Sequence, residues 1–174
     1  PQLHHILLQN AAALSISDIA IPLDASPGFT LVFTGRIEPA TASDNILALL
    51  DATAQPICAL QYDPSTATSA TLFYDTAITT TVSSAFPPYA PSAPPQVYTI
   101  VFDATGMSFY KDATLLSSSP YTGTFTARTA TQVTLAPSLS SSLSLCSLLF
   151  FNTALSSTDV QYVTSPPSID SSNI

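Results

Sequence analysis

The chain has 174 residues, of which 46% are hydrophobic and only 8% are charged, and three basic residues against eleven acids give a net charge of −8. This length and apolar fraction fit one domain with a sizeable core and argue against disorder. The negative charge repels polyanions, so we expect no nucleic-acid partner. No apolar run approaches the roughly 18 residues of a membrane-spanning helix, so we expect no membrane insertion.

Short blocks of alternating, β-branched and aromatic residues recur along the whole chain, and no long stretch has the apolar period of a helix. The predicted strands are 3–9, 12–20, 28–37, 45–51, 56–62, 70–75, 77–83, 96–103, 107–111, 113–117, 122–127, 131–136 and 143–151. So many short strands predict an all-β fold, and they favour a two-sheet antiparallel jelly-roll sandwich over a small barrel.

Two segments interrupt or end this pattern. Residues 86–95, FPPYAPSAPP, form a proline-rich insertion that cannot join a sheet ladder and should lie on the surface. Near the end, SSTDVQYV predicts one short helix, capped by Ser156 or Ser157 with Asp159 in its first turn. The polar residues 164–174 are expected to form a tail or a linker.

Three segments share their order and spacing with one group of folds. They are the opening strands in LSISDIAIPLDASPGFTLVFTGRIEP, the hairpin in QVYTIVFDATGMSFYKDATLL, and the closing strand and helix in SLLFFNTALSSTDVQYV. Together they resemble the laminin-G-like, or concanavalin-A-like, family of lectin and glucanase jelly rolls across about residues 11–163. The chain departs from the family pattern at Tyr98, near the usual Trp, and at Ala113, which replaces the Gly of the turn after Asp112.

Catalytic chemistry finds little support in this sequence. Retaining glycosidases need two carboxylates about 5 Å apart in one cleft, whereas the sole glutamate, Glu38, stands beside Pro39 at a strand end. His4 and His5 are adjacent, so on a strand they point to opposite faces and cannot bind one metal ion together. There is no Gly-x-Ser-x-Gly elbow for a hydrolase triad. We therefore expect no enzymatic activity and no cofactor.

Calcium is the one metal that the resemblance suggests, because family members often hold it with Asp carboxylates near the rim of the sheet. The available ligands are Asp44, Asp51, Asp75 and Asp112. No Asp-x-Asp cluster concentrates charge, so a turn role is the favoured interpretation for each of them. Carbohydrate binding would need exposed aromatic side chains, for which the candidates are Tyr62, Tyr74, Tyr89 and Tyr121.

The two cysteines, Cys58 and Cys146, lie far apart and belong to no CxxC or Cys/His cluster. We expect a structural disulfide, with two buried thiols as the alternative, because the charge-poor, Ser/Thr-rich composition is typical of a secreted protein. No Asn-x-Ser/Thr sequon is present. The Pro, Ala and Ser segments nevertheless resemble O-glycosylated, hydroxyproline-rich wall proteins, with a stiff unmodified loop as the alternative. The candidate positions are Pro87, Pro88, Pro91, Ser92, Pro94, Pro95, Ser165, Pro166 and Pro167.

Residues 1–10, PQLHHILLQN, form an extra apolar strand or arm ahead of the family's usual start. This strand could add to the sheet of the next copy through Leu3, Ile6, Leu7 and Leu8, which would build a filament. Alternatively it folds back as an edge strand of its own sheet. The leading prediction is a secreted, non-catalytic structural subunit that assembles with itself or with other surface proteins. The alternative is a lectin-like module of a larger surface protein that binds glycan through one rim of the sandwich.

Overall fold

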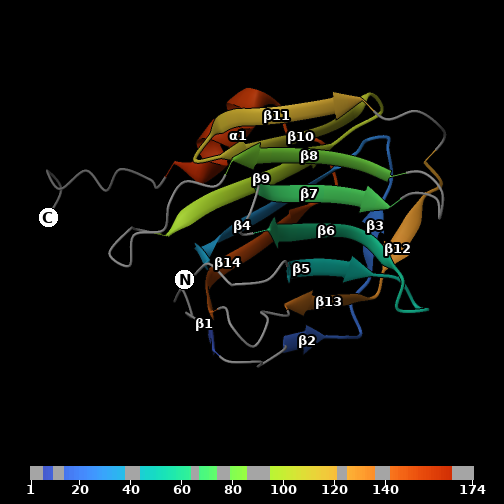
Figure 1. Cartoon of the computed structure of the whole chain (residues 1–174). Coiled ribbons are helices and arrows are strands. Elements are labelled where there is room, and N and C mark those ends of the chain that lie inside the picture. The colour runs from blue at the N-terminus through green and yellow to red at the C-terminus, as the bar shows by residue number, and fades with distance from the viewer. Residues whose placement is uncertain are drawn as a thin grey trace, which may run out of the picture.

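The computed structural model describes residues 6–9, 14–37, 44–63, 67–73, 79–85, 95–120, 125–135 and 142–165. These residues form two six-stranded antiparallel sheets, a two-stranded sheet and one helix (Figure 1). Sheet A contains, in spatial order, β1 (Ile6–Gln9), β14 (Ser142–Phe151), β4 (Phe29–Ile37), β9 (Gln96–Phe102), β10 (Gly106–Lys111) and β11 (Thr114–Pro120). Sheet B contains β2 (Leu14–Ile16), β13 (Gln132–Leu135), β5 (Asp44–Leu50), β6 (Pro56–Asp63), β7 (Ala67–Phe73) and β8 (Thr79–Ala85). The predicted all-β, two-sheet sandwich with one short helix is confirmed.

The core lies between the two sheets and follows from alternation along their strands. In β4, Phe29, Leu31 and Phe33 point inward and are almost completely buried. The rings of Phe29 and Phe33 contact other aromatic rings of the core, and the ring centroid of Phe29 lies 5.2 Å from that of Phe102. Sheet B contributes mainly aliphatic side chains to the same core, among them Leu47, Leu49, Leu60, Val133 and Leu135. Each of these buried side chains removes apolar surface from water, and the aromatic rings remove the largest areas, so the core stabilises the packing of the two sheets.

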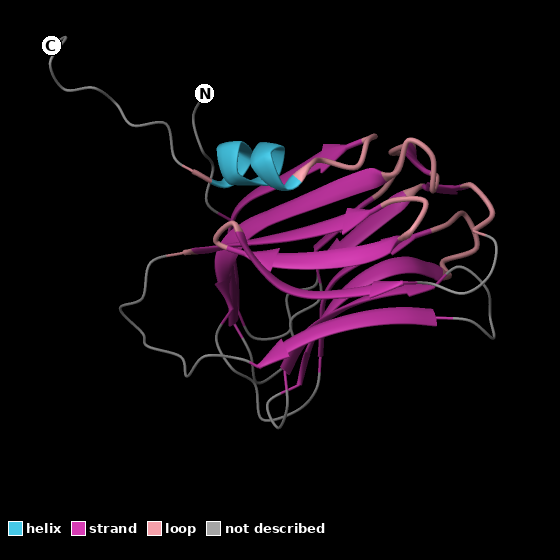
Figure 2. Cartoon of the chain, turned by 90° about the horizontal axis from the view of Figure 1, so that it is seen from above, coloured by secondary structure: helices cyan, strands magenta, loops and turns pink. Residues whose placement is uncertain are grey.

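The outer face of sheet A is also covered. Helix α1 (Ser157–Thr164) lies against it (Figure 2), and Val160 of this helix is fully buried. Thr30, on the outer side of β4, fixes the chain that leads into the helix: its Oγ1 donates to the carbonyl oxygen of Thr153 and accepts from the N–H of Leu155, both at 2.9 Å. Ser156 caps the helix in a capping box with Asp159, which confirms the predicted helix and selects Ser156 of the two candidate caps. In the described part of the chain, no helix has the length and apolarity needed to cross a membrane.

Two predictions of strand position are wrong. The segment 12–20 is not one strand, because the chain leaves β2 after Ile16 and Asp18 takes a left-handed φ of 60°. It then forms β3 (Ile21–Leu23), which pairs with β12 (Arg128–Ala130) in the two-stranded sheet. Of the predicted strand 122–127, the described residues 125–127 are not in a strand. A three-residue strand is too short for its alternation to be recognised in a sequence. Proline is also rare inside strands, so Pro22 argued against a strand at β3.

The N-terminal strand pairs within its own chain. β1 runs antiparallel to β14, with Ile6 opposite Leu145 and Leu8 opposite Leu143. In the structure, Ile6, Leu7 and Leu8 therefore fold back onto the edge of their own sheet, which was the alternative to their donation to a neighbouring copy. Leu3 lies outside the described residues, as do residues 86–94 of the proline-rich insertion and residues 166–174 of the tail.

The structure does not support the predicted Cys58–Cys146 disulfide. Cys58 is a free, completely buried thiol in β6 of sheet B, whereas Cys146 belongs to β14 of sheet A, where the side chain is outside the described set. Burial raises the pKa of Cys58 to about 12, so this thiol stays protonated and behaves as a small core side chain.

The turn between β10 and β11 carries a removable strain. Asp112 and Ala113 have φ values of 46° and 66°, a pair of left-handed residues that a tight hairpin requires and that Ala adopts at a cost. We expect Ala113→Gly to stabilise the protein by about 1 kcal/mol, measured as the free energy of unfolding in urea. Ala104→Gly, at an exposed turn position without a positive φ, is the matched control. A destabilised Ala113→Gly variant would contradict this interpretation of the turn.

Candidate functional site

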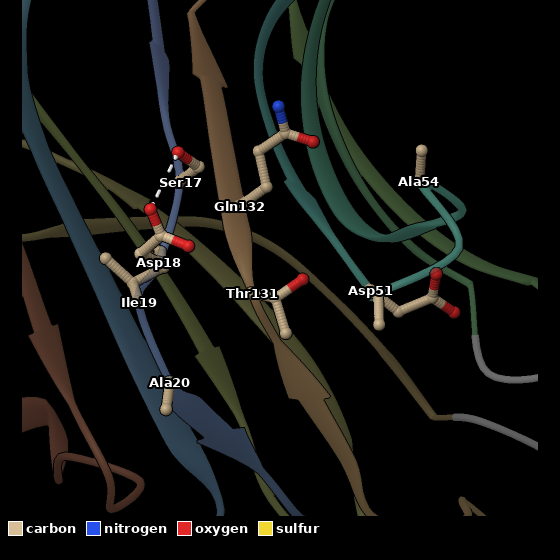
Figure 3. Close-up of a pocket in the computed structure, with 9 residues that line it drawn as sticks. Ser17, Asp18, Ile19, Ala20, Asp51, Ala54, Thr131 and Gln132 are labelled. Atoms are coloured by element: carbon tan, nitrogen blue, oxygen red, sulfur yellow. Dashed lines mark hydrogen bonds between the residues drawn. The ribbon is translucent and has the colours of Figure 1, made fainter.

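An open hollow of about 610 Å³, which we call the end pocket, lies where neighbouring strands of sheet B end (Figure 3). Three segments line it: residues 17–20 after β2, residues 51–54 after β5, and Thr131 with Gln132 at the start of β13. These segments meet because β13 pairs with β2 on one side and with β5 on the other, with Val133 opposite both Ile16 and Leu49. The pocket is therefore a product of strand order in sheet B.

Backbone hydrogen bonds hold the three walls together. The N–H of Ile19 donates to the carbonyl oxygen of Thr131 at 3.4 Å, and the N–H of Thr131 donates to that of Leu50 at 2.9 Å. These two bonds join the wall after β2 to β13 and join β13 to β5. The side-chain amide of Gln132 donates to Ser15 Oγ, which orients it along β2. Backbone hydrogen bonds thus fix the relative positions of the three walls of the end pocket.

Asp51 organises the turn that forms one wall. Its Oδ1 accepts from the N–H of Thr53 at 2.9 Å, from Thr53 Oγ1 at 2.7 Å and from the N–H of Gln55 at 2.9 Å. The hydroxyl of Thr53 and the N–H of Gln55 together lower the pKa of Asp51 against the opposing effect of burial, and Arg128 adds a weaker attraction. Arg128 Nη2 lies 3.9 Å from Asp51 Oδ2. Asp51 is thus an ionised turn residue with one oxygen committed to the backbone.

Asp18 supplies a second carboxylate from the opposite wall, as Figure 3 shows. Its left-handed backbone turns the chain between β2 and β3, and Ser17 Oγ donates to its Oδ2 at a long 3.5 Å. Aspartate is one of the few side chains that adopt this conformation readily. Its side chain is exposed, and among the described residues it has no ion pair.

The chemistry available in the end pocket is hydrogen bonding. Hydroxyls of Ser17 and Thr131, the amide of Gln132 and two carboxylates line it, and Ile19 provides an apolar side chain. No described histidine, cysteine or lysine lines the pocket, so the described lining has no nucleophile paired with a base of the triad kind. Within the described ranges, no group of three or more His, Cys, Asp or Glu side chains gathers as a metal site would require. The lining suits a ligand with several hydroxyl groups.

The two predicted calcium ligands whose side chains the structure describes, Asp51 and Asp112, lie at different places. Asp51 lies in the end pocket, whereas Asp112 lies at the β10–β11 turn, where its Oδ1 accepts from the N–H of Val97 at 3.0 Å. Asp44 begins β5, and Asp75 lies outside the described residues. Asp51 and Asp112 both act as turn residues, which was the favoured interpretation of the sequence.

Most of the residues predicted to stack on sugars or to carry glycans lie outside the part of the chain that the structure describes. Tyr62 lies in β6 but its side chain is not described, and Tyr74, Tyr89 and Tyr121 lie outside the described residues. Of the candidate glycosylation positions, Pro95 and Ser165 are described and exposed. The remaining candidates are outside the description: Pro87, Pro88, Pro91, Ser92, Pro94, Pro166 and Pro167.

Sequence reasoning did not single out Asp18 and Gln132, two polar residues that line the end pocket. The only local signal for Asp18 was the polar pair Ser17-Asp18, which breaks the alternation of the predicted strand 12–20. Gln132 carried no signal, because a polar residue on a strand is ordinarily a solvated one. A second, smaller hollow of about 300 Å³ beside the β9–β10 turn includes Asp103. Asp103 Oδ1 accepts three hydrogen bonds from Thr105 and Gly106, so this carboxylate serves the turn.

The fold and the hollow define a class of protein: a β-sandwich module with an open polar pocket at the ends of one sheet. No protein-family model matches the sequence, and no curated protein sequence matches it either. Among solved structures, the fold is similar to the receptor-binding domain of botulinum neurotoxin type G, with a TM-score of 0.64 and 11% identity over 93% of this chain and 46% of that chain. It is also similar to the binding domain of botulinum neurotoxin DC in complex with SialylT, with a TM-score of 0.64 and 10% identity over 92% of this chain and 45% of that chain.

A third similar structure is the same botulinum neurotoxin DC binding domain in complex with rat synaptotagmin II, with a TM-score of 0.64 and 11% identity over 92% of this chain and 46% of that chain. This chain therefore spans slightly less than half the length of the structures it matches. At such low identity the likeness establishes the β-sandwich fold. By their names, the first of these neighbours is a receptor-binding domain and the other two are structures of a binding domain.

Proposed function

We propose that this chain is a non-catalytic, extracellular recognition module that binds glycan through the end pocket. The observation that carries the proposal is the pocket itself, whose walls are fixed by backbone hydrogen bonds and whose lining offers hydroxyl, amide and carboxylate groups. Such groups bind sugar hydroxyls by multiple weak hydrogen bonds, and affinities in the millimolar range are typical of a single site of this kind.

The names of the structural neighbours support a recognition role, since they include complexes with SialylT and with synaptotagmin II. The pairing of β1 with β14 of its own chain supports the fold-back alternative, and so it favours the recognition module over the structural subunit. The charge-poor composition fits a secreted module, and the resemblance to lectin-type jelly rolls points in the same direction.

A blocked pocket tests the proposal. Ala20 is exposed and lines the pocket, so Ala20→Tyr should fill part of it without disturbing the core. A glycan array first identifies a sugar that the unaltered protein binds. We expect Ala20→Tyr to bind this sugar with at least tenfold lower affinity. The affinity is measured by NMR titration, in which the backbone N–H signals of Ile19 and Gln132 are followed. Ala104→Tyr places the same side chain on the exposed β9–β10 turn and should bind as the unaltered protein does. Equal affinity of the two variants would show that sugar, if bound, is bound elsewhere.

A further inference from the structure

The charges around the end pocket restrict which sugars it can accept. Two carboxylates, Asp18 and Asp51, line the pocket. The one cation that the structure pairs with either of them is Arg128, which lies 3.9 Å from Asp51. Asp18 has no ion pair among the described residues. The net charge of these three groups is therefore negative, and the net charge of the whole chain is −8.

We infer that the end pocket selects uncharged sugar rings and rejects acidic ones, such as uronic and sialic acids. This inference rests on the proposed function and names its ligand class. A carboxylate on the ligand would have to lie within a few ångströms of Asp18, where two like charges repel. An uncharged ring can instead donate its hydroxyl protons to Asp18, since an ionised carboxylate is an acceptor only.

Of the basic residues, Lys111 and Arg128 have described side chains, and neither of them reverses this negative charge. Lys111 lies at the end of β10 in sheet A, and it does not line the pocket. Arg128 is half-buried beside Asp51 and is not among the groups that line the pocket. The remaining lining groups, the hydroxyls of Ser17 and Thr131 and the amide of Gln132, are neutral. No lining group among the described residues offers the bidentate cation that carboxylate recognition usually employs.

Matched sugar pairs test the inference. The probes are the methyl glycosides of glucose, galactose and mannose, each compared with its uronic acid, which differs only by a carboxylate in place of the C6 hydroxymethyl group. Affinities are measured by NMR titration of the full chain at low salt and in 1 M NaCl. We expect each uronate to bind about fourfold more weakly than its hexose, or weaker still, at low salt. The difference should shrink in 1 M NaCl, where screening acts over about 3 Å.

Two charge-neutralising variants separate local from overall charge. Asp18→Asn should raise the uronate-to-hexose affinity ratio about fourfold. Asp24→Asn removes the same charge from an exposed residue outside the pocket and should leave this ratio unchanged. Uronates that bind as well as hexoses, or a ratio that responds equally to both variants, would overturn the inference and leave the glycan-binding proposal standing. If no sugar of either series binds, the proposed function itself is wrong and this inference falls with it.

Discussion

Replacing Phe102 by alanine is expected to destabilise the protein by about 3 to 5 kcal/mol, a large part of the total stability of a typical domain. Phe102 is fully buried at the end of β9, and its ring centroid lies 5.2 Å from that of Phe29 and 5.0 Å from that of Phe125. Removing the ring loses its transfer free energy and leaves a cavity between these neighbours. The well-packed sandwich has little freedom to close this cavity.

The measurement is urea unfolding followed by far-UV circular dichroism, since the chain contains no tryptophan to report by fluorescence. Tyr162→Ala is the matched control, because Tyr162 on α1 is an aromatic residue that is 84% exposed. We expect this control to change the free energy of unfolding by no more than about 0.5 kcal/mol. A Phe102→Ala variant as stable as the control would show that the aromatic cluster does not form as described.

Gly28→Ala is the second substitution with a large expected effect. Gly28 has a φ of 85°, a conformation that costs a residue with a Cβ about 1 to 2 kcal/mol. A Cβ at this position would also overlap the carbonyl oxygen of Phe102 and lie only 2.8 Å from Ala154 Cβ. Overpacking of this kind typically adds another 1 to 3 kcal/mol, so we expect a total destabilisation of about 2 to 5 kcal/mol.

The clash also has a predicted location. Ala154 donates its N–H to the carbonyl oxygen of Pro27 at 2.9 Å, so a shift of Ala154 should loosen the segment that leads into α1. Hydrogen exchange should therefore accelerate at Ala154 and Leu155 in the Gly28→Ala variant more than in the centre of sheet B. Ser26→Ala, in the same turn at an exposed position, serves as the control and should alter stability by less than about 0.5 kcal/mol. Unchanged exchange at Ala154 would place the strain elsewhere.

The sequence determined most of the secondary structure, because the signals for it are local. Alternation of apolar and polar residues located β4, β9 and β10, and the spacing of Ser156 and Asp159 located the capped helix. The resemblance to laminin-G-like jelly rolls rested on the same segments and anticipated the two-sheet sandwich. Ala113 was recognised as a departure from a turn glycine, and the structure places it at positive φ.

Only the tertiary structure showed which strand each short segment pairs with and which polar residues lie together. Residues 6–9 could have joined any sheet edge, and only their pairing with Leu143 and Leu145 showed that the edge belongs to the same chain. The short strand β3 exists because β12 lies beside it, and only the structure showed that Cys58 is a free, buried thiol. The end pocket could not be predicted from the sequence either, because it depends on strand pairing. Asp18 and Gln132 stand far apart in the sequence, and they share one hollow because strand pairing, which depends on the whole chain, places β13 between β2 and β5.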